Sequence, residues 1–196
     1  MMKAYINPTW MKGPFSSYMT PQETSILISL IRSANPKVMF EFGVNLGVTA
    51  MQVLNHVPTL EKYIGVDAPS GCVTTLACQT SEVPGERAGI YAADDKRFTL
   101  LTSRTQDLTK EHMEPCDAVF IDGDHSALAV LHESEMSKAL CRPGGIIVWH
   151  DYGNPAVEVT MVLDRLYDQG WPIYSVNNSW LAFMRTGEQA NVSAAA

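Results

Sequence analysis

Short apolar runs alternate with amphipathic, helix-length segments along most of this chain, and no other feature of the sequence restricts the fold as strongly. Short apolar runs bounded by turn residues are typical of buried parallel strands, whereas apolar residues spaced three and four apart are typical of helices. We predict strands at 38–42, 63–66, 99–101, 118–121 and 146–149. We predict helices at 21–34, from near Gly47, over 126–140, and from an Asn154-Pro155 cap to Gly170.

The two ends of this pattern complete the expected fold. Thr20 and Glu23 form a capping box with Pro21 at the first helical position, so the first helix should begin there. At the other end, 172–176 and 180–184 are predicted to pair as a hairpin. We therefore expect an α/β fold with a single Rossmann-like, doubly wound sheet, mostly parallel with an antiparallel C-terminal hairpin strand.

The length of 196 residues and a hydrophobic content of 46% fit one domain with a continuous core. The segment 69–98 has no clear period, and a long irregular segment in a compact domain is usually functional or mobile. An apolar cluster precedes the first helix and comprises Trp10, Met11, Phe15, Tyr18 and Met19. The predicted division is a strap or lid at 1–20, a main domain at 21–185 and a flexible tail at 186–196.

The charge balance limits the class of partner. Fourteen basic residues against twenty-one acidic residues give a net charge of -7, which disfavours nucleic acid and anionic membranes and favours a small-molecule partner. The sequence has neither the apolar core of a signal peptide nor a run long enough to cross a bilayer, so we predict a cytoplasmic protein. The four cysteines are dispersed, and we expect reduced thiols.

A glycine loop follows the strand predicted at 38–42. Gly43 and Gly47 stand where a strand turns into a helix, and this position lets a main chain approach a ligand closely. Asp67 ends the next strand, where a carboxylate would accept both hydroxyls of a ribose. Two simpler interpretations stay open at this point: that the glycines serve only the turn, and that Asp67 only caps a helix.

The most specific segment is the acidic turn Asp122-Gly123-Asp124-His125, which directly follows a buried strand. Two carboxylates and an imidazole on one turn are unfavourable unless solvent, a cation or proton transfer compensates. Asp151 follows the next strand along the chain, so its carboxylate should converge with that of Asp122.

These motifs together resemble the class I S-adenosylmethionine-dependent methyltransferases over about residues 20 to 185. The acidic turn resembles the Phe-Ile-Asp-Gly-Asp-His signature of a small-molecule O-methyltransferase-like branch, which also carries Arg-Pro-Gly-Gly and His-Asp-Tyr, here at 142–145 and 150–152. The resemblance implies S-adenosyl-L-methionine as the cofactor and a small molecule as the methyl acceptor. The cofactor-binding residues that it implies are Glu41, Gly43, Asn45, Gly47, Asp67, Ala68, Ser103, Arg104 and Asp122.

The same resemblance implies roles in catalysis for Asp122, His125, His150 and Asp151. Related enzymes hold a metal with acids at the positions of Asp122 and Asp151, which would suit Mg²⁺. Tyr152 stands where those enzymes have a further acid, so metal dependence stays open. His125 is the preferred general base, and His150 is expected to orient Asp151.

Three alternatives are weighed against this interpretation. A nicotinamide-binding domain is disfavoured because the loop lacks Gly-x-Gly-x-x-Gly spacing. A hydroxylase-like enzyme on the same scaffold, and a regulatory protein that binds the cofactor without turnover, both stay open. The sequence predicts neither the acceptor nor the oligomeric state.

Overall fold

The computed structural model describes residues 11–112 and 114–188. Strands and helices alternate as predicted, and most predicted boundaries agree with the structure within one or two residues. The strands are β1 (Val38–Phe42), β2 (Lys62–Asp67), β3 (Phe98–Thr102), β4 (Cys116–Ile121), β5 (Cys141–Trp149), β6 (Tyr174–Ser175) and β7 (Ala182–Arg185). The α-helices are α1 (Pro21–Ser33), α2 (Val48–His56), α3 (Ala127–Leu140) and α4 (Val159–Asp168), with short 3-10 segments η2 (Ala77–Glu82) and η3 (Gly85–Arg87) between β2 and β3, and η4 (Thr105–Asp107) and η5 (Lys110–His112) before β4.

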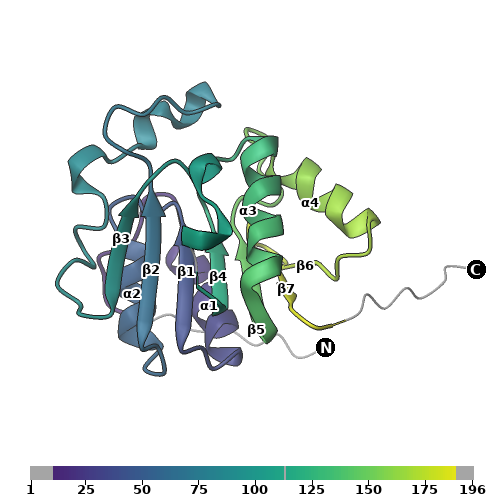
Figure 1. Ribbon diagram of the computed structural model, residues 1–196, viewed down its shortest axis with the longest axis horizontal. Coiled ribbons are helices and arrows are strands. Elements are labelled where there is room, and N and C mark those ends of the chain that lie inside the picture. Colours follow the sequence, from purple (N-terminus) through teal and green to yellow (C-terminus); the bar gives the residue numbers. More distant parts are fainter. Residues whose placement is uncertain (1–10, 113, 189–196) are drawn as a thin grey trace, which may run out of the picture.

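These strands form one sheet in the order β3-β2-β1-β4-β5-β7-β6 (Figure 1). The first five strands in this order, β3, β2, β1, β4 and β5, run parallel to one another. Strand β7 pairs antiparallel with both β5 and β6. The strand order reverses between β1 and β4, so the loops that follow these two strands separate there and can admit a ligand. The predicted doubly wound, mostly parallel sheet with an antiparallel C-terminal hairpin is confirmed.

Helices cover both faces of the sheet (Figure 1). The apolar sides of α1 and α2 pack on one face, in a core that includes Met39 and Tyr63. The apolar sides of α3 and α4 pack on the other face, in a core that includes Phe40 and Trp149. Alternate residues of the central strands thus enter different cores, which fixes the register of the sheet.

The predicted capping box at the start of α1 is present. The Glu23 main-chain N–H donates to Thr20 Oγ1 (3.2 Å), and the Thr20 N–H donates to Glu23 Oε2 (3.0 Å). The other carboxylate oxygen of Glu23 accepts the main-chain N–H of Trp180 (2.9 Å). The first helix is therefore tied to the loop that precedes β7.

The predicted cap of the last helix is wrong. Helix α4 begins at Val159, with Glu158 at the N-cap, four residues after the Asn154-Pro155 pair. Asn154 Oδ1 does accept the N–H of Ala156 (3.0 Å), but residues 155–158 form turns and bends, and the helix begins only after them. The Asn154 amide is directed to Asp151 instead, as described below.

The predicted segments at the two ends are partly described. In the cluster before α1, Trp10 lies outside the described residues, whereas Met11 and Met19 are buried in the core. Thr186, the predicted start of the tail, is buried and its main chain pairs with Gly144 and Gly145, while 189–196 lie outside the described residues. No helix in the described ranges is long and apolar enough to cross a membrane.

A substitution at Gly43 would test how closely the main chains after β1 and β4 approach each other, where the strand order reverses. Its φ of +79° is left-handed, and a Cβ at this position would lie 2.0 Å from the carbonyl oxygen of Asp122. Gly71 is a matched control, because its φ is +77° and a Cβ there would meet nothing within 4 Å. We predict that Gly71→Ala lowers the free energy of unfolding by about 1–2 kcal/mol, the cost of a left-handed residue.

Gly43→Ala should lower the free energy of unfolding by about 1–3 kcal/mol more than the control, because the two main chains must move apart. Urea unfolding of both variants measures the difference. Equal losses in the two variants would show that this close approach does not constrain the fold.

Candidate active site

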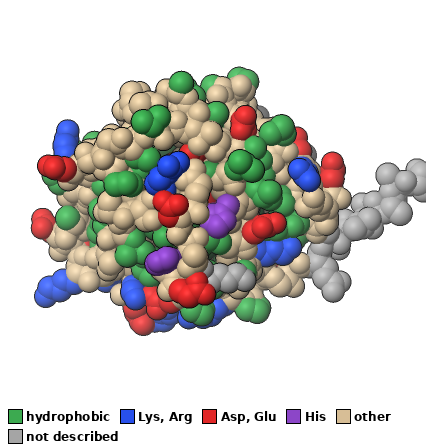
Figure 2. Space-filling model, turned by 45° about the horizontal axis from the view of Figure 1, so that its top comes forward, with side chains coloured by type: hydrophobic (Ala, Val, Ile, Leu, Met, Phe, Trp, Pro, Cys, Tyr) green, Lys and Arg blue, Asp and Glu red, His purple; other side chains and the backbone are tan. Residues whose placement is uncertain are grey.

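A cavity of about 620 Å³ opens at the carboxyl ends of the central strands. Figure 2 turns this end of the sheet towards the viewer, and charged and apolar side chains are interspersed on the surface around it. The volume lies in the range of small-molecule and cofactor sites. The predicted site residues that line it are Gly43, Asn45, Asp67, Ala68, Ser103, Arg104, Asp122, His125, His150 and Asp151.

The glycine loop, residues 43–47, forms one wall. Gly43, Asn45 and Gly47 all have positive φ angles, of 79°, 50° and 82°. This sequence of left-handed residues exposes the main chain of the loop to the cavity. Gly47 itself packs against Gly89, whose Cα would lie 2.8 Å from a Cβ at Gly47, and it does not line the cavity.

Asp67 stands beside this loop at the end of β2. Its Oδ2 accepts the N–H of Asn45 (2.6 Å) and its Oδ1 accepts the N–H of Ala68 (2.8 Å). Burial raises the pKa of Asp67 to about 6, although these main-chain hydrogen bonds oppose the shift. Asp67 therefore supports the loop rather than a helix, and its carboxylate retains lone pairs for a ligand hydroxyl.

Glu41 is placed differently from the prediction. Its side chain is fully buried on the face of the sheet covered by α1 and α2, next to the Tyr63 hydroxyl, and it lies outside the cavity lining. Burial raises the pKa of its carboxyl well above the usual value, which favours the neutral acid. Of the predicted cofactor-binding residues, Glu41 and Gly47 are thus the two that do not line this cavity.

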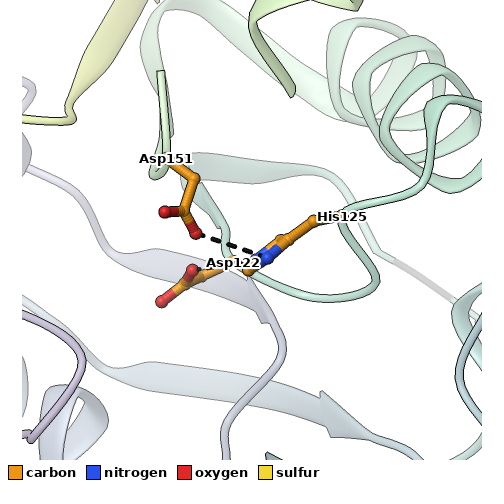
Figure 3. A group of neighbouring side chains, drawn as sticks. All are labelled: Asp122, His125 and Asp151. Carbon is orange, nitrogen blue, oxygen red and sulfur yellow. Dashed lines mark hydrogen bonds and ion pairs between the residues drawn. The ribbon is translucent and has the colours of Figure 1, made fainter. Parts of the chain in front are cut away.

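Four side chains at the ends of β4 and β5 meet in one group, which we call the His–Asp cluster: Asp122, His125, His150 and Asp151. His125 lies between the two acids, with Nε2 3.3 Å from Asp122 Oδ1 and Nδ1 3.3 Å from Asp151 Oδ2 (Figure 3). His150 Nδ1 lies 3.3 Å from Asp122 Oδ1 and 3.4 Å from Asp151 Oδ2. Both histidines thus contact both carboxylates.

The charges in this cluster support one another. Burial alone would raise the pKa of Asp122, but the two histidines bring it down to about 2. Burial alone would lower the pKa of His150, but the carboxylates raise it to about 10, and they also raise the pKa of His125. The protonated His150 therefore offsets part of the carboxylate charge within a largely buried site.

Asp124, the second acid of the turn, has a different position. Its Oδ1 accepts the main-chain N–H of Ser126 (2.9 Å), and its Oδ2 accepts hydrogen bonds from Thr75 (3.1 Å) and Gln106 (3.3 Å). Burial would raise the pKa of Asp124, but the bonds from Ser126 and Thr75 lower it. Asp124 therefore holds the turn in place and stays apart from the His–Asp cluster.

The structure adds residues that the sequence analysis did not assign to the site. Asn154 Nδ2 donates to Asp151 Oδ1 (2.6 Å). The only sign of this contact in the sequence was that Asn154 follows Asp151 by three residues. Trp180 lines the cavity with its ring centre 6.3 Å from that of His150. Gln79 and Glu82 come from the irregular segment, where no pattern marks them.

The donor atoms of the cluster are close enough for a cation. Asp122, His125 and Asp151 each offer one ligand atom, and these atoms lie within 4.8 Å of one another. Two carboxylates with one imidazole suit a divalent ion such as Mg²⁺, Mn²⁺ or Zn²⁺. The predicted pair Asp122 and Asp151 is thus brought together, with His125 as a third donor.

Glu133 of α3 lies behind the acidic turn and is fully buried. A Cβ on Gly123 would lie 2.9 Å from Glu133 Oε1, so the turn packs directly on this side chain. Burial raises the pKa of Glu133 to about 8, against the opposing effects of Thr105 and His125. The acid is therefore mostly protonated at neutral pH.

Comparison with known proteins gives a family match. The family described as "Methyltransferase domain" matches residues 40–152, which is more than half of the chain and includes the glycine loop and the His–Asp cluster. A comparison with curated proteins gives no match.

Several solved structures share the fold. A putative caffeoyl-CoA O-methyltransferase from Staphylococcus aureus has a TM-score of 0.65 at 15% identity, over 89% of this chain and 86% of that one. The methyltransferase PaMTH1 of Podospora anserina, bound to S-adenosylhomocysteine (SAH), has a TM-score of 0.64 at 13% identity, over 86% and 80%. The TDP-rhamnose 3'-O-methyltransferase CalS11 has a TM-score of 0.60 at 15% identity, over 85% and 80%.

Glu133 gives a prediction for stability against pH. Its folded pKa of about 8 lies above the usual 4.5, so the folded state binds this proton more tightly than the unfolded state. The contribution of Glu133 to stability is therefore present below about pH 4.5 and is lost as the pH rises through 8. Glu133→Gln cannot ionise and should become more stable relative to the wild type as the pH rises.

Urea unfolding between pH 5 and pH 8.5 measures this effect, and we expect the difference to grow by about 1 kcal/mol or more, since one pKa unit corresponds to about 1.36 kcal/mol. Glu135→Gln, an exposed position on the same helix, is the control and should follow the wild type. A Glu133→Gln curve parallel to that of the wild type would contradict the raised pKa.

Proposed function

The chain belongs to the methyltransferase-domain family, and from this premise we propose that it transfers a methyl group from S-adenosylmethionine to an oxygen of a small molecule. One observation carries the proposal: a single cavity is lined by the glycine loop, by Asp67 and by the His–Asp cluster. A cofactor site and a proton-accepting group therefore share one space. The similarity to structures described as O-methyltransferases supports oxygen as the acceptor atom.

The cofactor occupies the half of the cavity at β1 and β2 in this proposal. The main chain of Gly43 to Asn45 surrounds its methionine part, and Asp67 accepts hydrogen bonds from the ribose hydroxyls. Ala68, Ser103 and Arg104 line the end of the cavity near β3, where the adenine fits. The acidic groups of the cavity favour the positive charge of the sulfonium.

The acceptor occupies the half at β4 and β5. A hydroxyl placed between Asp122 and Asp151 lies next to His125, which in its neutral form takes the hydroxyl proton as the oxygen attacks the methyl carbon in line with the sulfur. His150 has a pKa of about 10, so it keeps its proton and holds the two carboxylates in place. Most of the acceleration comes from positioning and from charge already arranged in the site.

A divalent cation is the second part of the proposal. The carboxylates of Asp122 and Asp151 would hold the ion, and His125 would remain the base. When bound, the ion would act as a Lewis acid that lowers the pKa of the acceptor hydroxyl.

An uncharged small molecule fits the acceptor half of the cavity better than nucleic acid does, because the whole chain carries a net charge of -7.

Paired substitutions test the assignment of the two halves. Asp122→Asn should reduce methyl transfer by about 100-fold or more, the scale of a lost electrostatic contact at the reacting groups, while the affinity for SAH changes little. Asp67→Asn should instead weaken SAH binding by about 10-fold, because about 1.4 kcal/mol of charged hydrogen bonding is lost.

Titration calorimetry measures SAH binding, and a labelled methyl group on S-adenosylmethionine measures transfer to a panel of phenols, catechols and sugars. Loss of SAH binding in Asp122→Asn would overturn the division into two halves. SAH binding without transfer in the wild type would favour a regulatory protein. Oxygen uptake with Fe²⁺ supplied would favour a hydroxylase-like enzyme.

The metal is tested separately. Chelation should lower methyl transfer, and Mg²⁺ or Mn²⁺ should restore it, because the acceptor oxygen loses its polarising ion. Asp151→Asn should lose Mn²⁺ binding, measured by calorimetry, and keep SAH binding. Asp164→Asn, an acid on α4 outside the cavity lining, is the control. Full transfer by the metal-free protein would show that the side chains act alone.

A further inference from the structure

The segment between β2 and β3, residues 69–97, which we call the insert, forms a wall of the cavity and contacts both of its halves. On the cofactor side, Asn45 Nδ2 donates to the main-chain oxygen of Glu82 (2.7 Å). On the acceptor side, Thr75 Oγ1 donates to Asp124 Oδ2 (3.1 Å). Figure 1 shows the insert, in blue and teal, above the carboxyl ends of β2 and β3. The insert therefore bridges the two loops that follow β1 and β4.

Gln79 makes the closest link between the insert and the chemistry. It is the buried residue of η2, with 5% of its surface exposed, whereas its neighbours Cys78 and Thr80 are exposed. Its Nε2 donates to the carbonyl oxygen of Gly123 (3.1 Å), and its Oε1 accepts the main-chain N–H of His125 (2.9 Å). One side-chain amide thus spans the acidic turn.

We propose that Gln79 is a positioning residue: its amide fixes the turn that carries His125, and the insert acts as a lid that completes the site when it is closed. We call the two hydrogen bonds from the Gln79 amide to the turn the clamp. The consequence for methyl transfer rests on the proposed function, whereas the clamp rests on geometry alone.

The turn needs such a clamp for two reasons. Gly123 has no side chain to restrict the main chain between Asp122 and His125, so the turn is intrinsically permissive. The imidazole of His125 lies at 3.3 Å from each carboxylate, so a small rotation of the turn would lengthen one contact or the other. Displacement of a reacting group by about 1 Å can reduce a rate by 100-fold.

The main chain of His125 is held on both sides. Gln79 accepts its N–H, and its carbonyl oxygen accepts the N–H of Glu158 from the start of α4 (3.1 Å). The second contact belongs to the helical layer, whereas the first comes from a segment of 3-10 turns with few buried residues. Such segments open at low free-energy cost, so the insert can move while the helical layer stays in place.

The contacts also connect the cofactor to the clamp. Asn45 belongs to the glycine loop and binds Glu82, which lies three residues after Gln79 in the same 3-10 segment. A ligand that orders the loop should therefore order η2 and, through Gln79, the His125 turn. We expect the lid to be held closed more firmly when the cofactor site is filled.

Hydrogen exchange of the full chain tests this directly, with SAH as the probe ligand. In the wild type, SAH should slow the exchange of peptides from 72–83 and of the peptide that contains His125. Gln79→Ala should speed exchange of the His125 peptide by about 10-fold or more, since a main-chain hydrogen bond is lost. SAH affinity should stay within about threefold of the wild type, a difference under 1 kcal/mol.

Two further variants make the result specific. Gln79→Glu can still accept the N–H of His125 but cannot donate to Gly123, so its exchange should be intermediate between those of the wild type and Gln79→Ala. Ser81→Ala changes an exposed side chain of the same 3-10 segment and should match the wild type. Thermal unfolding of each variant separates a local effect from loss of the fold.

Methyl transfer to the best acceptor of the panel gives the catalytic readout. Gln79→Ala should reduce kcat by about 10-fold or more with little change in the KM for S-adenosylmethionine, because the loss lies in positioning. Unchanged exchange at the His125 peptide in Gln79→Ala would overturn the proposal. If the wild type methylates nothing, the proposed function fails, and the exchange result still decides the clamp.

Discussion

The close approach of the main chains at Gly43 and Asp122 is the contact on which the site depends. Asp122 N–H donates to the carbonyl oxygen of Phe42 (2.9 Å), and Gly43 leaves no room for a side chain beside Asp122. This contact lies where the strand order reverses, between β1 and β4. The glycine loop and the acidic turn are therefore neighbours at their base and separate above it, which creates the cavity.

Charge balance is the second constraint. Asp122 and His125 follow β4, whereas His150 and Asp151 follow β5, so the cluster exists only when these two strands pair. Removing one partner would leave a buried charge without compensation, which is far more costly than losing a surface ion pair. Asp151 adopts a left-handed φ of 62°, a conformation uncommon for residues other than glycine, and its bond from Asn154 helps to keep it there.

Much of the fold and part of the site followed from local patterns. The strands, the capping box and the hairpin could be predicted because periodicity and capping act within a few residues. The convergence of Asp122 with Asp151 followed from strand order. The position of Glu41 follows from strand alternation, which places it on the same face as Met39, under the helices. By contrast, the role of Gln79 depends on contacts 44 and 46 residues away, and its segment has no period that would reveal them.

The cavity thus combines walls of different origin. The glycine loop and the His–Asp cluster begin at the ends of buried strands, where packing on both faces fixes the main chain. The insert contributes Thr74 from an irregular stretch and Gln79 and Glu82 from η2, above the carboxyl ends of β2 and β3. Substitutions in the insert can therefore alter the shape of the cavity without disturbing the core. The exception is Gln79, because its amide connects that adaptable wall to the turn that carries His125, so the shape of the cavity and the geometry of the His–Asp cluster are coupled through one side chain.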